Sequence, residues 1–154
     1  MTSIQVAVVG SGTAAPELAR TAGEVGRLLA ERGCVVVCGG LGGVMEAVAR
    51  GAKEAGGITI GVLPGESRVE ANPWIDHAVA TGIGHARNLA VVASGDAVIA
   101  VGGEWGTASE VAFARKLGRP VVLLGRGPVI DGDGIHRAET AAEAVELAVS
   151  LADV

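Results

Sequence analysis

Short β-branched runs along this chain end in glycine-rich turns, and each turn leads into a segment with helical periodicity. The runs expected to form strands are residues 4–9, 34–38, 58–63, 96–101 and 121–124, with 75–80 as a further candidate. Most are apolar on both faces, as is typical of strands in a parallel sheet that helices cover on both sides. The alternation predicts a Rossmann-like, doubly wound α/β domain with a mostly parallel sheet and helices on both faces.

Apolar stripes and glycine stops define the helices between these strands. Leu18, Ala22, Val25 and Leu29 recur at four- and three-residue steps, and Gly33 follows them as a helix terminator. Residues 125–137 are expected to form a glycine-rich loop. Because the chain has no internal repeat and no compositional boundary, we expect one domain over residues 1–154. The other expected helices are residues 44–55, 84–93, a helix that opens at 102–106 and ends near 117, and 140–152.

Glycine accounts for 25 of the 154 residues, without the period that collagen requires. Hydrophobic residues make up 49% of the chain, which excludes a disordered class. No apolar run approaches the ~18 residues of a membrane span, so we expect no membrane association. Cys34 and Cys38 lie too far apart along one strand for a comfortable disulfide, which favours a reduced, cytoplasmic protein.

The formal net charge is −5, and the only lysines are Lys53 and Lys116. Binding to nucleic acid requires a basic face that follows the phosphates, so nucleic acid is not an expected partner. Histidines and cysteines lack zinc-like spacing, and we expect no metal site. Charged residues make up 19% of the chain, below the ~25% of typical soluble domains, which favours burial of apolar surface against another subunit.

Three glycine-rich turns stand where ligands bind in such a sheet, at the carboxyl ends of strands. Glycine lets backbone N–H groups approach an anion closely, and a helix N-terminus attracts negative charge. A parallel sheet needs tight turns for structural reasons too, but three of them in one chain favour a phosphate-bearing ligand. The residues predicted to bind it in these turns are Gly10, Ser11 and Gly12, then Gly39, Gly40, Gly42 and Gly43, then Gly102, Gly103, Glu104, Trp105, Gly106 and Thr107.

The first turn formally fits the dinucleotide pattern G-x-G-x-x-A through Gly10, Gly12 and Ala15. That pattern also requires an acidic residue at the end of the second strand to hold the ribose. Here the second strand ends in Cys38 and Gly39, so a nicotinamide cofactor is disfavoured.

The second and third turns carry a resemblance to a known family. Residues 38–46 (CGGLGGVME), 57–64, 87–88 and 102–110 (GGEWGTASE) resemble the LONELY GUY (LOG) superfamily in order and spacing, over about residues 4–125. Members of that superfamily are often labelled lysine decarboxylases and include cytokinin-nucleotide phosphoribohydrolases. Its short-chain branch contains molybdenum-cofactor carrier proteins. The resemblance implies a Rossmann-like fold and a homodimer or homotetramer.

For the enzymes of this superfamily, the resemblance implies two catalytic residues, an arginine on a helix and the last glutamate of P-G-G-x-G-T-x-x-E. They cleave the N-glycosidic bond of a nucleoside 5′-monophosphate. Arg87 and Glu110 occupy these positions here, with Asn88 as a neighbouring polar candidate for ligand binding. A carboxylate stabilises oxocarbenium charge and orients the attacking water, and a guanidinium suits a phosphate. This chemistry requires no cofactor.

The third turn departs from the family pattern. Gly102 stands at the position of the proline, and Glu104 stands at that of the second glycine. A carboxylate in a phosphate-binding turn would repel the phosphate, and it replaces a residue that is free to adopt a positive φ. Glu104 therefore disfavours hydrolysis of an ordinary nucleotide and favours the short-chain branch, where a different ligand or simple binding is the role.

Several of these residues also have structural interpretations. Thr107 and Glu110 have the spacing of a capping box, as do Thr140 and Glu143 before the last helix. Arg87 could be a solvated arginine. Trp105 could stack on a base or pterin, or it could line a subunit contact.

Two functional hypotheses follow, together with a structural one. The first is a carrier or sensor that binds a phosphate-bearing small molecule, such as a nucleotide or the molybdenum cofactor, at the glycine turns. The alternative is a nucleoside 5′-monophosphate phosphoribohydrolase of the LOG type that uses Glu110 and Arg87. A structural or interaction protein without a ligand is the third hypothesis.

Overall fold

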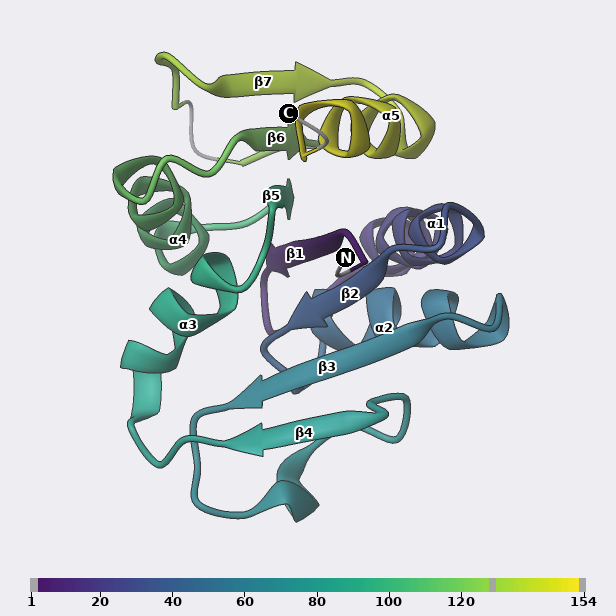
Figure 1. Ribbon diagram of the computed structural model, residues 1–154, viewed down its shortest axis with the longest axis vertical. Helices are drawn as coiled ribbons and strands as arrows, with labels where there is room; N and C mark the ends of the chain where they lie inside the picture. The colour runs from purple at the N-terminus through teal and green to yellow at the C-terminus, as the bar shows by residue number, and fades with distance from the viewer. Residues whose placement is uncertain (1–2, 128–129, 153–154) are drawn as a thin grey trace.

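The computed structural model describes residues 3–127 and 130–152, in which one sheet lies between two layers of helices (Figure 1). All neighbouring strands pair in parallel, in the order β4-β3-β2-β1-β5-β6-β7. The predicted Rossmann-like α/β fold is therefore confirmed. The strands are β1 (Gln5–Gly10), β2 (Val35–Cys38), β3 (Ile58–Leu63), β4 (His77–Ala80), β5 (Ala97–Val101), β6 (Val121–Leu124) and β7 (Ile135–Ala138).

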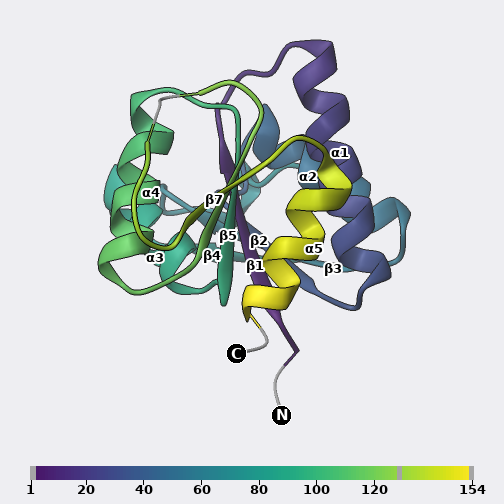
Figure 2. The same cartoon turned by 90° about the horizontal axis from the view of Figure 1, so that it is seen from above.

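Helices α1, α2 and α5 cover one face of the sheet, and α3 and α4 cover the other (Figure 2). None of the helices in the described ranges is both long enough and apolar enough to cross a membrane. The helices are α1 (Pro16–Glu31), α2 (Val44–Glu54), α3 (Arg87–Ala93), α4 (Trp105–Lys116) and α5 (Ala141–Ala152), with short 3-10 turns η1 (Arg68–Glu70) and η2 (Gly84–Ala86).

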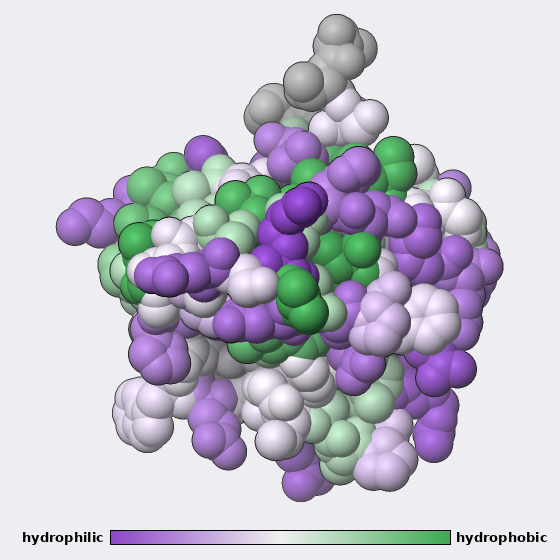
Figure 3. Space-filling model, turned by 90° about the horizontal axis from the view of Figure 1, so that it is seen from below, coloured by the Kyte–Doolittle hydropathy of each residue, from purple (hydrophilic) through white to green (hydrophobic). Residues whose placement is uncertain are grey.

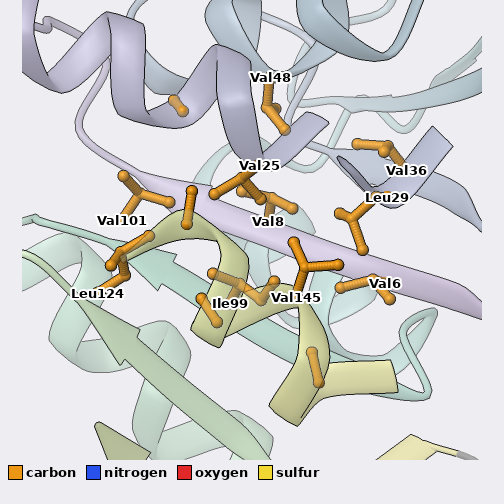
Figure 4. Close-up of a cluster of buried hydrophobic side chains, with 14 of the residues drawn as sticks. Val6, Val8, Val25, Leu29, Val36, Val48, Ile99, Val101, Leu124 and Val145 are labelled. Atoms are coloured by element: carbon orange, nitrogen blue, oxygen red, sulfur yellow. The ribbon is translucent and has the colours of Figure 1, made fainter. Parts of the chain in front are cut away.

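The larger hydrophobic core lies under α1, α2 and α5. Valine and leucine side chains of these helices, such as Val25, Val48 and Val145, meet side chains of the central strands, such as Val8 and Ile99 (Figure 4). All five are buried. On the surface, hydrophobic residues form small groups between hydrophilic ones in the view from below (Figure 3).

One predicted loop contains a strand. Residues 125–137 were expected to be loop throughout, but Ile135–Ala138 forms β7, in which Ile135 pairs with Val121 and Ala138 with Leu124. The prediction was wrong because this edge strand has only four residues, of which one is fully buried, so it lacks the continuous apolar run that marks the central strands.

The order in which the strands are added to the sheet changes direction at β1. From β1 the chain proceeds through β2 and β3 to β4 on one side, and then it crosses to β5 and continues to β7 on the other. At such a switch point the turns after neighbouring strands lead apart and leave a crevice, which is where ligands bind in open α/β sheets. Here the crevice is bounded by the turns that follow β1, β2 and β5.

Helices α1 and α2 pack against each other through glycines rather than through side chains. A Cβ at Gly26 would overlap the carbonyl oxygen of Val48, and one at Gly51 would overlap the carbonyl oxygen of Gly23. By contrast, a Cβ at Gly23 would lie 3.7 Å from the nearest heavy atom, an ordinary van der Waals contact.

We therefore expect Gly51→Ala and Gly26→Ala each to lower the free energy of unfolding by about 2–3 kcal/mol, because the backbones of two packed helices must separate. Gly23→Ala is the matched control on the same interface, and its better helix propensity is expected to leave stability equal or slightly higher. Urea unfolding followed by circular dichroism measures all three. Equal destabilisation in the three variants would show that close helix packing is not the cause.

Candidate functional site

A cavity of about 270 Å³ opens at the carboxyl ends of β1, β2 and β5. It joins the first and third glycine turns to residues of η2 and α3 that are far away in the sequence. Ten of the sixteen predicted site residues line it: Gly10, Ser11, Gly12, Gly39, Arg87, Asn88, Glu104, Gly106, Thr107 and Glu110.

Two of the glycine turns are in direct backbone contact. The N–H of Val44, the first residue of α2, donates to the carbonyl of Ser11 at 3.0 Å. A Cβ at Gly43 would overlap the backbone of Ser11 and Gly12, and one at Gly10 would lie 2.7 Å from Cγ1 of Val44. Gly10 and Gly43 thus allow the turns after β1 and β2 to meet, which brings the N-terminus of α2 to the cavity.

The most unusual side chain in the cavity is Arg87, which is only 8% exposed. It is the first residue of α3, and its guanidinium extends toward the end of β2, where Nη2 donates to the carbonyl of Gly39 at 3.4 Å. Nη1 donates to Oδ1 of Asn88, while the buried Nε has no hydrogen-bond partner within residues 3–127 and 130–152. The alternative of a solvated Arg87 is therefore wrong. Burial lowers the pKa of the Arg87 guanidinium, and the Glu110 carboxylate opposes that shift.

The absence of a side chain at residue 39 makes room for this arginine. A Cβ at Gly39 would lie 2.7 Å from Nη2 of Arg87 and 2.6 Å from Sδ of Met45. Gly39 therefore contributes in two ways: the missing side chain leaves room for the guanidinium, and the backbone carbonyl accepts its hydrogen bond.

Glu110 lies on the inward side of α4 and is also only 8% exposed. Burial raises the pKa of Glu110 to about 7, and the nearby Arg87 charge opposes this shift. Within the described ranges, no carboxylate is in salt-bridge contact with Arg87. Arg87 and Glu110 are thus both buried in one cavity, yet they do not form a salt bridge with each other.

The capping interpretation of Glu110 is wrong. Helix α4 begins at Trp105 with Glu104 as its N-cap, so Thr107 and Glu110 already lie inside the helix. The comparison motif does form its cap, because the N–H of Glu143 donates to Oγ1 of Thr140 at 3.1 Å and the N–H of Glu139 donates to Oε2 of Glu143 at 2.8 Å.

Glu104 does not take the backbone conformation that a glycine would supply. Gly102 and Gly103 have φ of 61° and 116°, whereas Glu104 has φ of −128° and is extended. Replacing a glycine that is free to adopt a positive φ therefore causes no backbone strain at Glu104, since the two preceding glycines make the turn. Its side chain makes no cap hydrogen bond at the start of α4.

The six other predicted site residues do not line the cavity. Gly40 packs against Leu63, Gly43 forms the turn contact described above, and Trp105 is 86% exposed to solvent. Four lining residues were not predicted, although each lies beside a predicted feature: Val8 and Val9 precede the first turn, Met45 lies within residues 38–46, and His85 is two positions before Arg87. The predicted residues outside the cavity are Gly40, Gly42, Gly43, Gly102, Gly103 and Trp105, and the unpredicted lining residues are Val8, Val9, Met45 and His85.

The cavity has no evident metal-binding set. Across residues 3–127 and 130–152, no group of three or more histidine, cysteine, aspartate or glutamate side chains could hold an ion. Cys34 and Cys38 are both buried free thiols. The cavity therefore offers hydrogen bonds and charge to a ligand: one guanidinium, two carboxylates, the N–H groups of glycine turns, and the polar side chains of Ser11, His85, Asn88 and Thr107.

The matches to known proteins extend over almost the whole chain. The model of the SLOG cluster4 family matches residues 3–152. An uncharacterised protein from Archaeoglobus fulgidus is 45% identical over 150 residues, which are 97% of this chain and 97% of that protein.

Two solved structures are similar at 36–37% identity. The molybdenum cofactor carrier protein of Chlamydomonas reinhardtii is 37% identical, with a TM-score of 0.92 over 99% of this chain and 100% of the other. The molybdenum cofactor binding protein of Rippkaea orientalis is 36% identical, with a TM-score of 0.90 over 98% of each chain.

Proposed function

The chain belongs to the SLOG cluster4 family, and from this premise we propose that it binds the molybdenum cofactor, a phosphate-bearing pterin, as a carrier. The observation that carries the proposal is the buried Arg87, which lines a cavity bounded by glycine turns and whose Nε has no hydrogen-bond partner among the described residues. The two similar structures named for binding or carrying this cofactor support the choice of ligand.

Arg87 supplies the anion-binding end of the cavity. A buried donor without a partner costs roughly 1–3 kcal/mol, and more when the group is charged, so an anion bound to Arg87 would offset this cost. Guanidinium groups suit phosphate because their donors are arranged in a fork. The N-termini of α2 and α4 lie at the same edge and add favourable dipoles.

The size of the cavity fits partial enclosure of the cargo. Its volume of about 270 Å³ is slightly below the roughly 300–1,000 Å³ of pockets that enclose whole ligands. We infer that the cavity holds only part of the cofactor, including its phosphate, while another part stays outside. Such a site suits a protein that must pass its ligand on.

The proposal is tested by offering the apoprotein cofactor released from a molybdenum enzyme and then removing unbound material by gel filtration. Pterin fluorescence after oxidation of the protein fraction measures the captured cofactor. We expect close to one pterin per chain. A protein fraction without pterin, at concentrations that saturate a known carrier run alongside, would overturn the proposal.

A second candidate function is favoured by Glu110. A general acid–base works best when its pKa is near the operating pH, and that of Glu110 is raised to about 7 beside a phosphate-binding arginine. A phosphoribohydrolase would release free base and ribose 5-phosphate from AMP or a related monophosphate. Absence of base release from a panel of monophosphates would exclude this candidate and leave the carrier proposal intact.

We further propose that a second copy of the chain covers the outer side of α4. The inward side of this helix is buried, yet its outward side also carries large apolar groups, with Phe113 41% exposed and Trp105 largely exposed. Leu89 of α3 and Leu117 at the end of α4 are exposed on the same layer. A helix that is apolar on both sides is typically buried on both, and an isologous contact between two copies would achieve this.

Phe113→Glu is therefore expected to convert a homodimer or homotetramer into a smaller species, because it places a charge in an apolar contact. Light scattering coupled to gel filtration measures the mass. Val69→Glu, at an even more exposed apolar residue of η1, is the matched control and is expected to keep the wild-type mass. A monomeric wild-type protein would contradict the proposed contact.

A further inference from the structure

Glu104 is the one charged residue of the third turn, and neither the fold nor the capping of α4 accounts for it. Its backbone is extended and its side chain does not cap the helix. Within the part of the chain that the structure describes, its carboxylate forms no hydrogen bond or salt bridge. It does, however, line the same cavity as the buried Arg87.

The sheet order places the residues that carry these two charges next to the ends of different strands. Arg87 reaches the carbonyl of Gly39 at the end of β2, and Glu104 follows β5. Strand β1 lies between β2 and β5. Because neighbouring strands are about 4.8 Å apart, the ends of β2 and β5 are separated by roughly 10 Å. A ligand that reaches from the end of β2 to the end of β5 therefore meets Arg87, with Glu110 nearby, on one side and Glu104 on the other.

This polarity restricts what the ligand presents to Glu104. An ionised carboxylate only accepts hydrogen bonds and repels other anions, so the phosphate must lie on the Arg87 side. On the Glu104 side, two adjacent N–H donors would match the two carboxylate oxygens in a bidentate pair. The 2-amino and ring N–H groups of a 2-amino-4-oxopyrimidine ring form such a donor pair. Adenine presents one donor beside one acceptor at its corresponding edge.

We propose that Glu104 binds the two-donor edge of a 2-amino-4-oxopyrimidine ring, the chemistry shared by pterins and guanine, while Arg87 binds the phosphate of the same ligand. The inference rests on the proposed function and adds the residue that selects the ring. It also explains why a carboxylate stands in a turn that otherwise suits a phosphate: the phosphate binds on the Arg87 side of the cavity. The independent observation is that Arg87 lines the cavity and its buried Nε has no hydrogen-bond partner among the described residues, whereas Arg119, whose Nε also lacks a partner there, does not line it.

The test compares GMP with AMP, which share the phosphate and ribose and differ in the edge of the base. Isothermal titration calorimetry of the wild-type protein is expected to show GMP binding about tenfold more tightly than AMP, the effect of one charge-assisted hydrogen-bond pair at an exposed residue. Glu104→Gln is expected to reduce this ratio below about threefold and to leave the affinity for AMP nearly unchanged. Glu139→Gln, which removes an exposed carboxylate outside the cavity, is expected to keep the wild-type ratio.

A third titration with neopterin phosphate separates the two sources of the ring. Tighter binding of this ligand than of GMP identifies a pterin site, and the reverse identifies a guanine-nucleotide site; either result supports the role of Glu104 if it depends on that residue. Equal affinities for GMP and AMP in the wild-type protein, or a ratio unchanged in Glu104→Gln, would overturn it.

The outcomes also separate this inference from the proposed function. If all three ligands bind equally and all depend on Arg87, the anion site stands and only the role of Glu104 is lost. If none of the three ligands binds, the proposed function and the role of Glu104 both fail.

Discussion

Arg87→Met is expected to weaken binding of a phosphate-bearing pterin about a hundredfold while the protein remains folded. The substitution removes the buried guanidinium that faces the phosphate, and hydrogen bonds to charged groups contribute roughly 1.5–3 kcal/mol each. A hundredfold change in affinity corresponds to about 2.7 kcal/mol. The fold should survive because methionine fills a similar volume and leaves no unpaired cation in the core.

Two further variants make the Arg87 experiment specific. Arg87→Lys keeps the positive charge but loses the planar fork of donors, so an intermediate loss of about tenfold is expected. Arg20→Met removes an exposed arginine of α1 outside the cavity and should leave the affinity unchanged. Fluorescence titration with neopterin phosphate measures all three, and equal affinities for wild type and Arg87→Met would contradict the assigned anion site.

Glu110→Gln is expected to change how stability depends on pH. Burial raises the pKa of Glu110 from 4.5 to about 7 in the folded protein, so the folded state holds this proton more tightly than the unfolded state does. Stability from this group is therefore fully present at low pH and is lost as the pH rises from about 4.5 to about 7. The glutamine variant has no such proton to lose.

Between about pH 5 and pH 8, the free energy of unfolding of the wild type should fall by roughly 2–3 kcal/mol more than that of Glu110→Gln. Urea unfolding of both proteins at the two pH values gives this difference directly. For each protein, the free energy of unfolding at the lower pH is the reference for its value at the higher pH. Parallel pH dependence in the two proteins would show that Glu110 ionises in the fold as it does in the unfolded chain.

Much of the fold was predictable because its signals are local. Apolar runs such as residues 96–101 mark buried strands, and the glycine turns mark the places where strands lead into helices. The resemblance of the second and third turns identified the pair Arg87 and Glu110, and the structure brings both residues into one cavity. Strand β7 was missed because a short edge strand carries a weak pattern of its own.

The roles of individual turn residues were harder to predict, since they depend on contacts between distant segments. Nothing local shows that Gly43 packs on Ser11, or that Gly39 leaves room for Arg87. Likewise, Glu110 has the spacing of a cap, and only the start of α4 at Trp105 excludes that role. Burial of Arg87 follows from the path of α3 over the end of β2, which the sequence around Arg87 does not reveal.

The central claim is that the cavity between the turns after β1, β2 and β5 holds a phosphate-bearing pterin through Arg87. Native mass spectrometry of the protein, purified from cells that make the molybdenum cofactor, tests this claim most directly. We predict a mass increment that matches the pterin, with or without its metal, and we predict that Arg87→Met purified in parallel lacks it. An increment that persists in Arg87→Met, or a wild-type protein that carries no ligand and captures none when offered the cofactor, would contradict the claim.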